Sequence, residues 1–222
     1  MIANFPDPHE GELLYSVLAR FAERMNYPAL YTNLLELFGV RHGVPAIELP
    51  NKIDQLVSAL PPSSVYTSDS IIQKYTLLPF YAPFLPERSY ELILSNMKGL
   101  GVRTTQLRAG IVAGRVKPPE FFKSCPVCDQ ENLVRHGETY WKRVHQIRGV
   151  EICPVHGVFL EPTNVRLRGS ARRDALISAQ SAQRVVVAGR VDTSVCFRSA
   201  RHDVRYRRYV DLALFCIHGY NT

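Results

Sequence analysis

Apolar residues recur at helical spacing along the first hundred residues of the chain. The segment 10–24 predicts an amphipathic helix, whose apolar face consists of Leu13, Leu14, Val17, Leu18 and Phe21. Pro8 precedes this segment, and Glu10 and Glu12 would lie in its first turn, where acidic side chains favour the positive end of the helix dipole. We therefore expect a short extended stretch followed by a helix.

Three further segments have the composition of short helices separated by turns. The segment 28–39 ends at Gly39, which is typical of a helix C-cap. The segment 49–62 is bounded by Pro50 and Pro61. The segment 67–81 begins with Thr67 or Ser68, either of which would serve as an N-cap. The first part of the chain is thus predicted to be a group of packed helices.

A pair of helices separated by glycines is expected over residues 87–113. The first would run over 87–97, Gly99 and Gly101 interrupt the pattern, and Thr104 or Thr105 would cap a second helix through residue 111. Helix, glycine-containing turn and helix form the outline of a helix-turn-helix motif. The same pattern suits a hairpin that only packs against its neighbours, so the sequence leaves a DNA-reading role and a packing role open.

Two short motifs, Cys125-Pro-Val-Cys128 and Cys153-Pro-Val-His156, are separated by residues 129–152. Zinc requires four ligands at tetrahedral corners, and a gap of two residues lets each motif turn tightly enough to supply two of them. Gly157 follows the histidine, where a positive φ would close the turn. We predict one structural Zn²⁺, because three thiolates and one imidazole leave no open position for catalysis.

Other interpretations of the cysteines fit the sequence less well. A C-x-x-C can be a redox motif, but the βαβ pattern that usually accompanies it is absent. A second metal site would have irregular spacing, so buried thiols and surface histidines explain its members better; they are Cys196, His202, Cys216 and His218. The sequence contains no phosphate-binding loop, dinucleotide-binding glycine motif or H-E-x-x-H. We therefore expect a non-enzymatic protein.

Basic charge is concentrated in the last quarter of the chain. Of a net charge of +7, residues 1–120 contribute nothing, whereas residues 161–222 contain 11 Arg against 5 acidic side chains. These arginines could neutralise phosphates, although a solvated basic surface has the same composition. No apolar run reaches the roughly 20 residues of a transmembrane helix, and the N-terminal residues do not resemble a signal peptide. We expect a cytoplasmic protein without membrane contact.

Changes in composition divide the chain into three regions. We predict a mainly α fold with a small β zinc ribbon: a helical, helix-turn-helix-like region over 1–118, a zinc-ribbon module over 119–162 and an Arg-rich C-terminal region over 163–222. In the last region, residues 167–185 could be helical and residues 185–197 could pair as strands.

Two motifs at the ends of the span 6–162 resemble one known family. The first is P-x-P-x-E-G-E-x-L-Y-S-x-L-A-R over residues 6–20. The second begins with C-P-x-C, continues through Y-W-x-R-x-H-Q over 140–146 and G-V at 149–150, and ends with C-P-x-H-G. The combination of the two motifs is more specific than either cysteine motif alone. With both motifs present, the chain resembles the TniQ/TnsD family of transposon target-selection proteins.

The resemblance implies helix-turn-helix and zinc-ribbon modules and a role in recognising a target, either attachment-site DNA or a CRISPR effector complex. It also implies recruitment of the AAA+ regulator ATPase TnsC, which brings in the transposase, without catalysis by the family member itself. The zinc ligands carry over to Cys125, Cys128, Cys153 and His156. The 222 residues fit the short adaptors of RNA-guided transposition better than the longer DNA-reading forms.

From these observations we expect an adaptor between a target-recognition complex and a TnsC-like ATPase, in the bacterial cytoplasm at the nucleoid, with self-association left open. The alternative is a sequence-specific DNA-binding protein that recognises an attachment site. Partner contacts are expected at Tyr15, Arg20, Tyr140, Trp141, Arg143 and His145. Nucleic-acid contacts are expected at Arg103, Arg108, Arg166, Arg168, Arg172 and Arg173.

Overall fold

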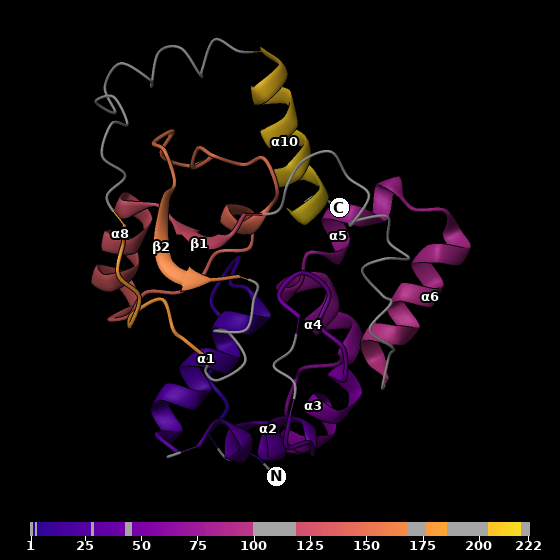
Figure 1. The fold of residues 1–222 in the computed structure, drawn as a ribbon. Helices are drawn as coiled ribbons and strands as arrows, with labels where there is room; N and C mark the ends of the chain where they lie inside the picture. The colour runs from indigo at the N-terminus through magenta and orange to yellow at the C-terminus, as the bar shows by residue number, and fades with distance from the viewer. Residues whose placement is uncertain are drawn as a thin grey trace.

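The computed structural model describes residues 2, 4–27, 29–42, 46–99, 119–167, 176–185 and 204–218. Within these residues the fold is mainly helical with one small sheet of two strands, and the predicted fold class is confirmed. Figure 1 shows α2, α3 and α4 gathered beside α1, with the two strands and α8 on the other side of α1. No helix in the described ranges combines the length and the apolar character needed to cross a bilayer.

The first helix, α1 (Leu14–Met25), begins at Leu14 rather than near residue 10. Gly11 has a φ of 67°, and Glu12 forms an isolated antiparallel bridge with Lys142. Glu10 and Glu12 therefore precede the helix, and the expectation that they lie in its first turn is wrong. The physical reason is that the backbone at residue 12 pairs with a distant segment instead of continuing into the helix.

The next helices follow the predicted segments closely. They are α2 (Leu30–Phe38), α3 (Ile53–Ala59) and α4 (Ser68–Tyr75). Gly39 caps α2 with a φ of 65°, as the sequence predicted. Thr67 caps α4 in a capping box: its hydroxyl accepts a hydrogen bond from the Ser70 N–H, and the Ser70 hydroxyl accepts one from the Thr67 N–H.

After α4 the chain forms α5 (Leu78–Tyr81), the short 3₁₀ helix η1 (Ala82–Phe84) and α6 (Glu87–Lys98). The first helix of the expected helix-turn-helix pair is thus present as α6. The second expected helix, near residues 104–111, lies outside the described residues.

The sheet consists of β1 (Phe121–Ser124) and β2 (Glu161–Arg166), which pair antiparallel with Lys123 opposite Pro162. Between the strands lie α8 (Pro126–His136), which the sequence analysis did not anticipate, and the 3₁₀ helix η2 (Val144–Gln146). Residue 162, where the end of the zinc module was placed, falls inside β2. The sheet therefore includes the first residues of the expected Arg-rich region.

The C-terminal region differs from its expected form where the structure describes it. Residues 176–185 form turns and an isolated bridge between Thr163 and Arg184, not a helix. The strands expected over 185–197 lie almost wholly outside the described residues. The last helix, α10 (Val204–His218), was not predicted; it packs against α5 and η2 (Figure 1). A stripe of buried side chains makes this contact: Val210, Ala213, Cys216 and Ile217.

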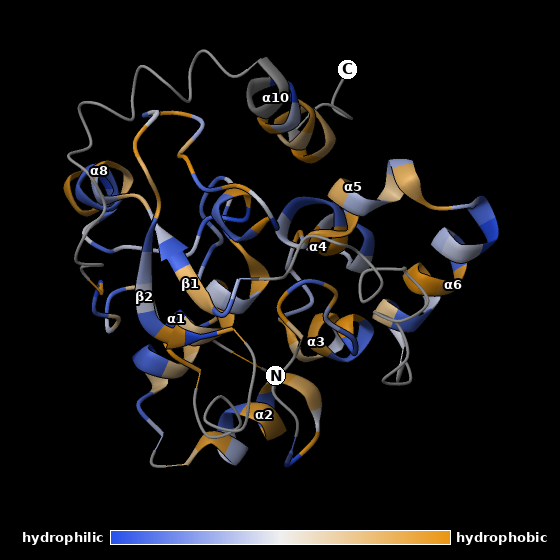
Figure 2. Cartoon of the chain, turned by 45° about the horizontal axis from the view of Figure 1, so that its top comes forward, coloured by the Kyte–Doolittle hydropathy of each residue, from blue (hydrophilic) through white to orange (hydrophobic). Residues whose placement is uncertain are grey.

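The helix α1 is buried on both sides and joins two hydrophobic cores. Leu14, Leu18 and Phe21 pack with residues of α2, α3, α4 and α6. Leu13 and Tyr15 pack instead with residues of the sheet and the segments around it. Figure 2 shows hydrophobic residues concentrated in the interior where these elements meet. The segment 119–167, which contains the sheet and α8, is called the ribbon from here on. The helical region and the ribbon cannot separate without exposing one face of α1 to water.

We expect Gly39→Ala to lower the free energy of unfolding by about 1 kcal/mol, because a Cβ is strained at a positive φ. No described atom lies within 4 Å of the position that this Cβ would take, so strain alone sets the cost. Gly39→Asn should cost less, since α1 itself ends at Asn26 with a φ of 47°. Urea denaturation measures both changes, and equal losses for the two variants would contradict the explanation.

Candidate metal centre

The first metal-binding motif joins β1 to α8. Cys125 is the N-cap of α8, and Pro126 lies in the first turn, where its missing N–H leaves no helical hydrogen bond unmade. The backbone N–H of Cys128 donates to the Cys125 sulfur at 3.5 Å. The first turn of the helix thus directs both cysteine side chains to one point.

The second motif is a tight turn between two extended segments. Ile152 and Phe159 form a bridge at its base, and the N–H of Gly157 donates to the Cys153 carbonyl at 2.7 Å. Gly157 has a φ of 67°, as the sequence predicted. This turn presents the side chains of Cys153 and His156 to the first motif.

Three sulfurs and one imidazole nitrogen converge between the two motifs, all within 4.8 Å of one another. The Cys128 sulfur is 3.7 Å from the Cys153 sulfur and 3.3 Å from His156 Nδ1. His156 Nδ1 is 3.6 Å from the Cys125 sulfur and 3.7 Å from the Cys153 sulfur. Ligands at the corners of a tetrahedron around one ion, with metal bonds of about 2.0–2.3 Å, are separated by roughly 3.5–3.8 Å. The four predicted ligands therefore form a closed set that could hold one metal ion.

The surroundings of the cluster favour the thiolate form of Cys153, whereas hydrogen bonds with Cys125 and Cys153 raise the pKa of Cys128. The three cysteines are buried and the histidine is partly exposed. Hydrogen bonds from the thiols of Cys125 and Cys128, and from the backbone N–H groups of Val155 and His156, lower the pKa of Cys153. Since the thiolate is the form that binds metals, this residue is prepared for coordination.

Glu131, on α8, supports the histidine from behind. His156 Nε2 lies 3.1 Å from Glu131 Oε1, which leaves Nδ1 to face the sulfurs. A carboxylate behind a ligating imidazole fixes the orientation and tautomer of the ring and raises its basicity. The sequence analysis missed Glu131, because an acidic residue at this position has no recognisable spacing to the histidine.

Two parts of the chain meet at an interface that we call the seam. One part is α1 together with residues 9–12, which precede it, and the other part is residues 138–146. Arg20 Nη1 donates to Glu12 Oε2 at 2.8 Å, and Arg20 also pairs with Glu138. The side chains of Arg20 and Glu12 are 4% and 0% exposed. Burial raises the pKa of Glu12 to about 7, and the charge of Arg20 opposes that rise. Arg24 and His9 reach the same Glu138 oxygen, at 3.0 and 3.1 Å.

Trp141 fills the apolar part of the seam. Its ring stacks on Phe122 with 4.5 Å between centroids. Its backbone N–H donates to the Ser16 hydroxyl at 3.0 Å, and its carbonyl accepts from the Leu13 N–H at 2.9 Å. The indole N–H donates to the Ile177 carbonyl at 3.1 Å. The motif over residues 6–20 and the motif over residues 140–146 thus pack against each other through both polar and apolar contacts.

The residues expected to contact a partner lie at this seam or directly behind it, and each is more than nine-tenths buried: Tyr15, Arg20, Tyr140, Trp141, Arg143 and His145. Burial is the main cause that lowers the pKa of His145 to about 4, which keeps its ring neutral. Within the described residues these side chains contact this chain's own segments. Direct contact with a partner stays a prediction. In the structure the members of this set other than His145 form contacts that join the helical region to the ribbon.

Of the arginines expected to contact nucleic acid, Arg166 is the one in the described ranges. It is exposed, pairs with Glu120 at 3.2 Å and lies over the Phe121 ring. The others lie outside the described residues: Arg103, Arg108, Arg168, Arg172 and Arg173. The same holds for Cys196 and His202 of the second cysteine and histidine set.

Arg20→Ala should lower the free energy of unfolding by about 3 kcal/mol, because it leaves the Glu12 carboxylate buried without its counter-charge. The matched control is Arg24→Ala, which removes a pair to the same Glu138 oxygen from a side chain that is 48% exposed. That pair should be worth about 0.5 kcal/mol. Urea denaturation at constant pH measures both variants, and similar losses would argue against the buried pair as the main link.

Cys153→Ser should abolish stoichiometric metal binding and lower the free energy of unfolding by several kcal/mol, because a serine hydroxyl is a poor substitute for a thiolate. Elemental analysis and thermal denaturation measure the two effects. Cys216→Ser is the control, since Cys216 is a buried thiol outside the cluster and its loss should leave metal content unchanged. One retained equivalent of metal in Cys153→Ser would contradict the assignment.

Comparison with known proteins matches the part of the chain that carries the seam and the metal cluster. The chain is 31% identical over 157 residues to the transposon Tn7 transposition protein TnsD of Escherichia coli. The matched region is 71% of this chain but 31% of that relative, so the chain spans less than a third of its length. The TniQ family model matches residues 3–160, from the segment before α1 to the end of the second metal-binding motif. With most of its length described by that one family, the chain belongs to the TniQ family.

Proposed function

We propose that this chain is a non-enzymatic adaptor that selects the target in transposition. It links a target-recognition complex, of the CRISPR-guided kind, or target DNA to a TnsC-like AAA+ regulator, and so recruits the transposase. Membership of the TniQ family and similarity to a transposition protein support this role. The observation that carries it is the extent of the family match, which covers α1, the seam and all four metal ligands together.

The ion in the four-ligand cluster is Zn²⁺ in this proposal. Three thiolates and one imidazole are a donor set that zinc favours in closed structural sites. Since the protein supplies all four corners, no position is left for a substrate or an activated water. The zinc then contributes folding free energy and fixes the relative positions of α8 and the second motif, which is consistent with a binding protein.

A rigid connection between the two regions supports the adaptor role. An adaptor must hold one binding face at a fixed position relative to another, so that the regulator is placed correctly on its target. The seam supplies this rigidity, because Trp141 binds α1 through backbone and side-chain contacts while Arg143 Nη1 donates to the carbonyls of Gln73 and Thr76 at the end of α4. The ribbon is therefore fixed to two separate helices.

A reconstituted transposition assay tests the role directly. We expect targeted insertion to fall to the level seen without the chain when Cys153→Ser replaces the wild type, because the ribbon loses its metal and its shape. Cys196→Ser, which changes a cysteine outside the four-residue cluster, should support normal insertion. Normal insertion with Cys153→Ser would overturn the structural-zinc part of the proposal.

A binding assay against labelled DNA separates the adaptor from the alternative, a sequence-specific DNA-binding protein. An adaptor should bind DNA weakly, without sequence preference and with a steep dependence on salt. Affinity for one site that survives excess competitor DNA would favour the alternative instead.

A further inference from the structure

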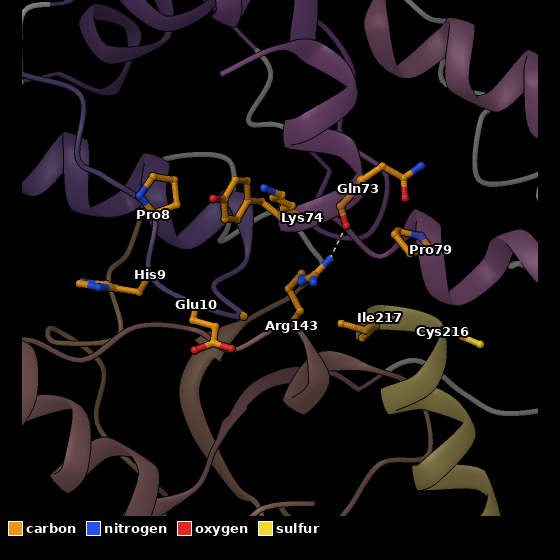
Figure 3. A pocket seen from close by; sticks show the side chains of 11 residues that line it. Pro8, His9, Glu10, Gln73, Lys74, Pro79, Arg143, Cys216 and Ile217 are labelled. Carbon is orange, nitrogen blue, oxygen red and sulfur yellow. Dashed lines mark hydrogen bonds between the residues drawn. The ribbon is translucent and has the colours of Figure 1, made fainter. Parts of the chain in front are cut away.

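A cavity of about 270 Å³ opens where five parts of the molecule meet: the turn before α1, the end of α4, the start of α5, the ribbon and the end of α10. Figure 3 shows Glu10, Lys74 and Arg143 projecting from three of these parts, with Cys216 and Ile217 of α10 beside them. The cavity lies away from the metal cluster, since none of the four ligands lines it.

Arg143 is the group in this cavity whose hydrogen-bonding capacity is incompletely used. Its side chain is buried, and its Nη1 donates to the carbonyls of Gln73 at 2.8 Å and Thr76 at 3.0 Å. Its Nε is also buried but has no hydrogen-bond partner among the described residues. Burial lowers the pKa of Arg143 to about 10, so the side chain remains a cation at neutral pH.

The other buried arginines of the described ranges show what Arg143 lacks. Arg20 pairs with Glu12 and Arg148 pairs with Glu48, each with a side chain less than a tenth exposed. No carboxylate in the described part of the chain forms an ion pair with Arg143. Glu10 lines the same cavity, yet Figure 3 shows its carboxylate turned away from the Arg143 side chain. Buried charges in proteins are normally paired, so this cation calls for an anion from outside.

We propose that the cavity binds the carboxylate of an acidic side chain from a protein partner. One carboxylate in the cavity would pair with the positive charge of the Arg143 guanidinium that lines it. Lys74, exposed at the end of α4, adds a second cation to the same wall, and the Tyr75 phenol lines the cavity next to it. This site would bind a partner protein whichever target the chain selects, so the proposal goes beyond the proposed function.

The composition of the walls favours a peptide over a nucleic acid. A nucleic-acid strand carries one charge about every 3.4 Å, so several phosphates would approach the Glu10 carboxylate at once. A single acidic side chain brings one charge to Arg143, and Glu10 is then free to accept a peptide N–H. Pro8, Pro79 and Ile217 add apolar surface that suits the methylene groups of a glutamate.

The test uses the zinc-loaded full chain and a fluorescein-labelled tetrapeptide of glutamate, with the glutamine tetrapeptide as its uncharged counterpart. Fluorescence anisotropy should show the glutamate peptide binding about tenfold or more tightly than the glutamine peptide, because the charge of the carboxylate is lost in the latter. Equal binding of the two peptides would overturn the proposal.

Two charge reversals locate the site. Lys74→Glu should weaken binding of the glutamate peptide about tenfold or more, whereas Arg88→Glu, an exposed reversal on α6 that does not line the cavity, should leave it unchanged. Arg143→Lys should also weaken binding, since lysine lacks the planar fork; circular dichroism and zinc content verify its fold. The two exposed variants decide the question if Arg143→Lys does not fold.

Equal losses in Lys74→Glu and Arg88→Glu would overturn the proposal, because the peptide would then be attracted by general surface charge. Displacement of the peptide from the wild type by duplex DNA, with DNA binding lost in Lys74→Glu but kept in Arg88→Glu, would also overturn it. That result would identify the cavity as a phosphate site.

Discussion

The carboxylate of Glu12 is fully removed from water, and a buried carboxylate requires a cation beside it. Arg20 provides this cation from α1, two turns of helix further along, and then reaches Glu138 in the ribbon. Because one guanidinium pairs with carboxylates from both regions, it ties the helices to the ribbon. The apolar stacking of Trp141 on Phe122 and the two cores that share α1 are arranged around that link.

The metal cluster depends on the same arrangement and in turn reinforces it. A metal ion bound by the cluster would fix the start of α8 through Cys125 and Cys128, and α8 leads directly to Glu138. The other side of the cluster is held by the turn at Cys153 and His156, which follows the segment that carries Trp141 and Arg143. A metal ion held by these four residues would therefore position the ribbon's half of the seam, although none of the four contributes to the seam itself.

Sequence reasoning found those features that depend on residues close together in the chain. The positive φ of Gly157 and a cap of α4 at Thr67 or Ser68 are local features, and the structure confirms the first and selects Thr67 for the second. The C-P-V-C and C-P-V-H motifs are equally local, and the structure brings their four side chains together in a cluster that could hold a metal ion. The helix α8 was missed because its first turn coincides with the first ligand motif and its later residues lack strong periodicity. The helix α10 was missed because arginines interrupt its apolar stripe.

Contacts between residues far apart in the chain were not found by sequence reasoning. Glu12 was assigned to a helix N-terminus because its partners, Lys142 on the backbone and Arg20 by charge, could not be inferred from local pattern. Glu138 was not singled out at all, since nothing in its neighbourhood indicates three basic side chains converging from residues 9, 20 and 24. Trp141 and Arg143 were expected on a surface for the same reason: a motif identifies residues that matter but not whether they face outward or inward.

The hydrogen bond between Ser16 and Trp141 spans 125 residues of chain, which has a consequence for how the protein is made. When α1 leaves the ribosome, the surface that will cover its second face does not yet exist. At ordinary rates of synthesis the helix waits on the order of 10 s for that surface. During this interval Leu13 and Tyr15 remain exposed beside Arg20, whose second partner Glu138 has not yet been made, so the nascent chain has to be protected from aggregation until the ribbon is complete.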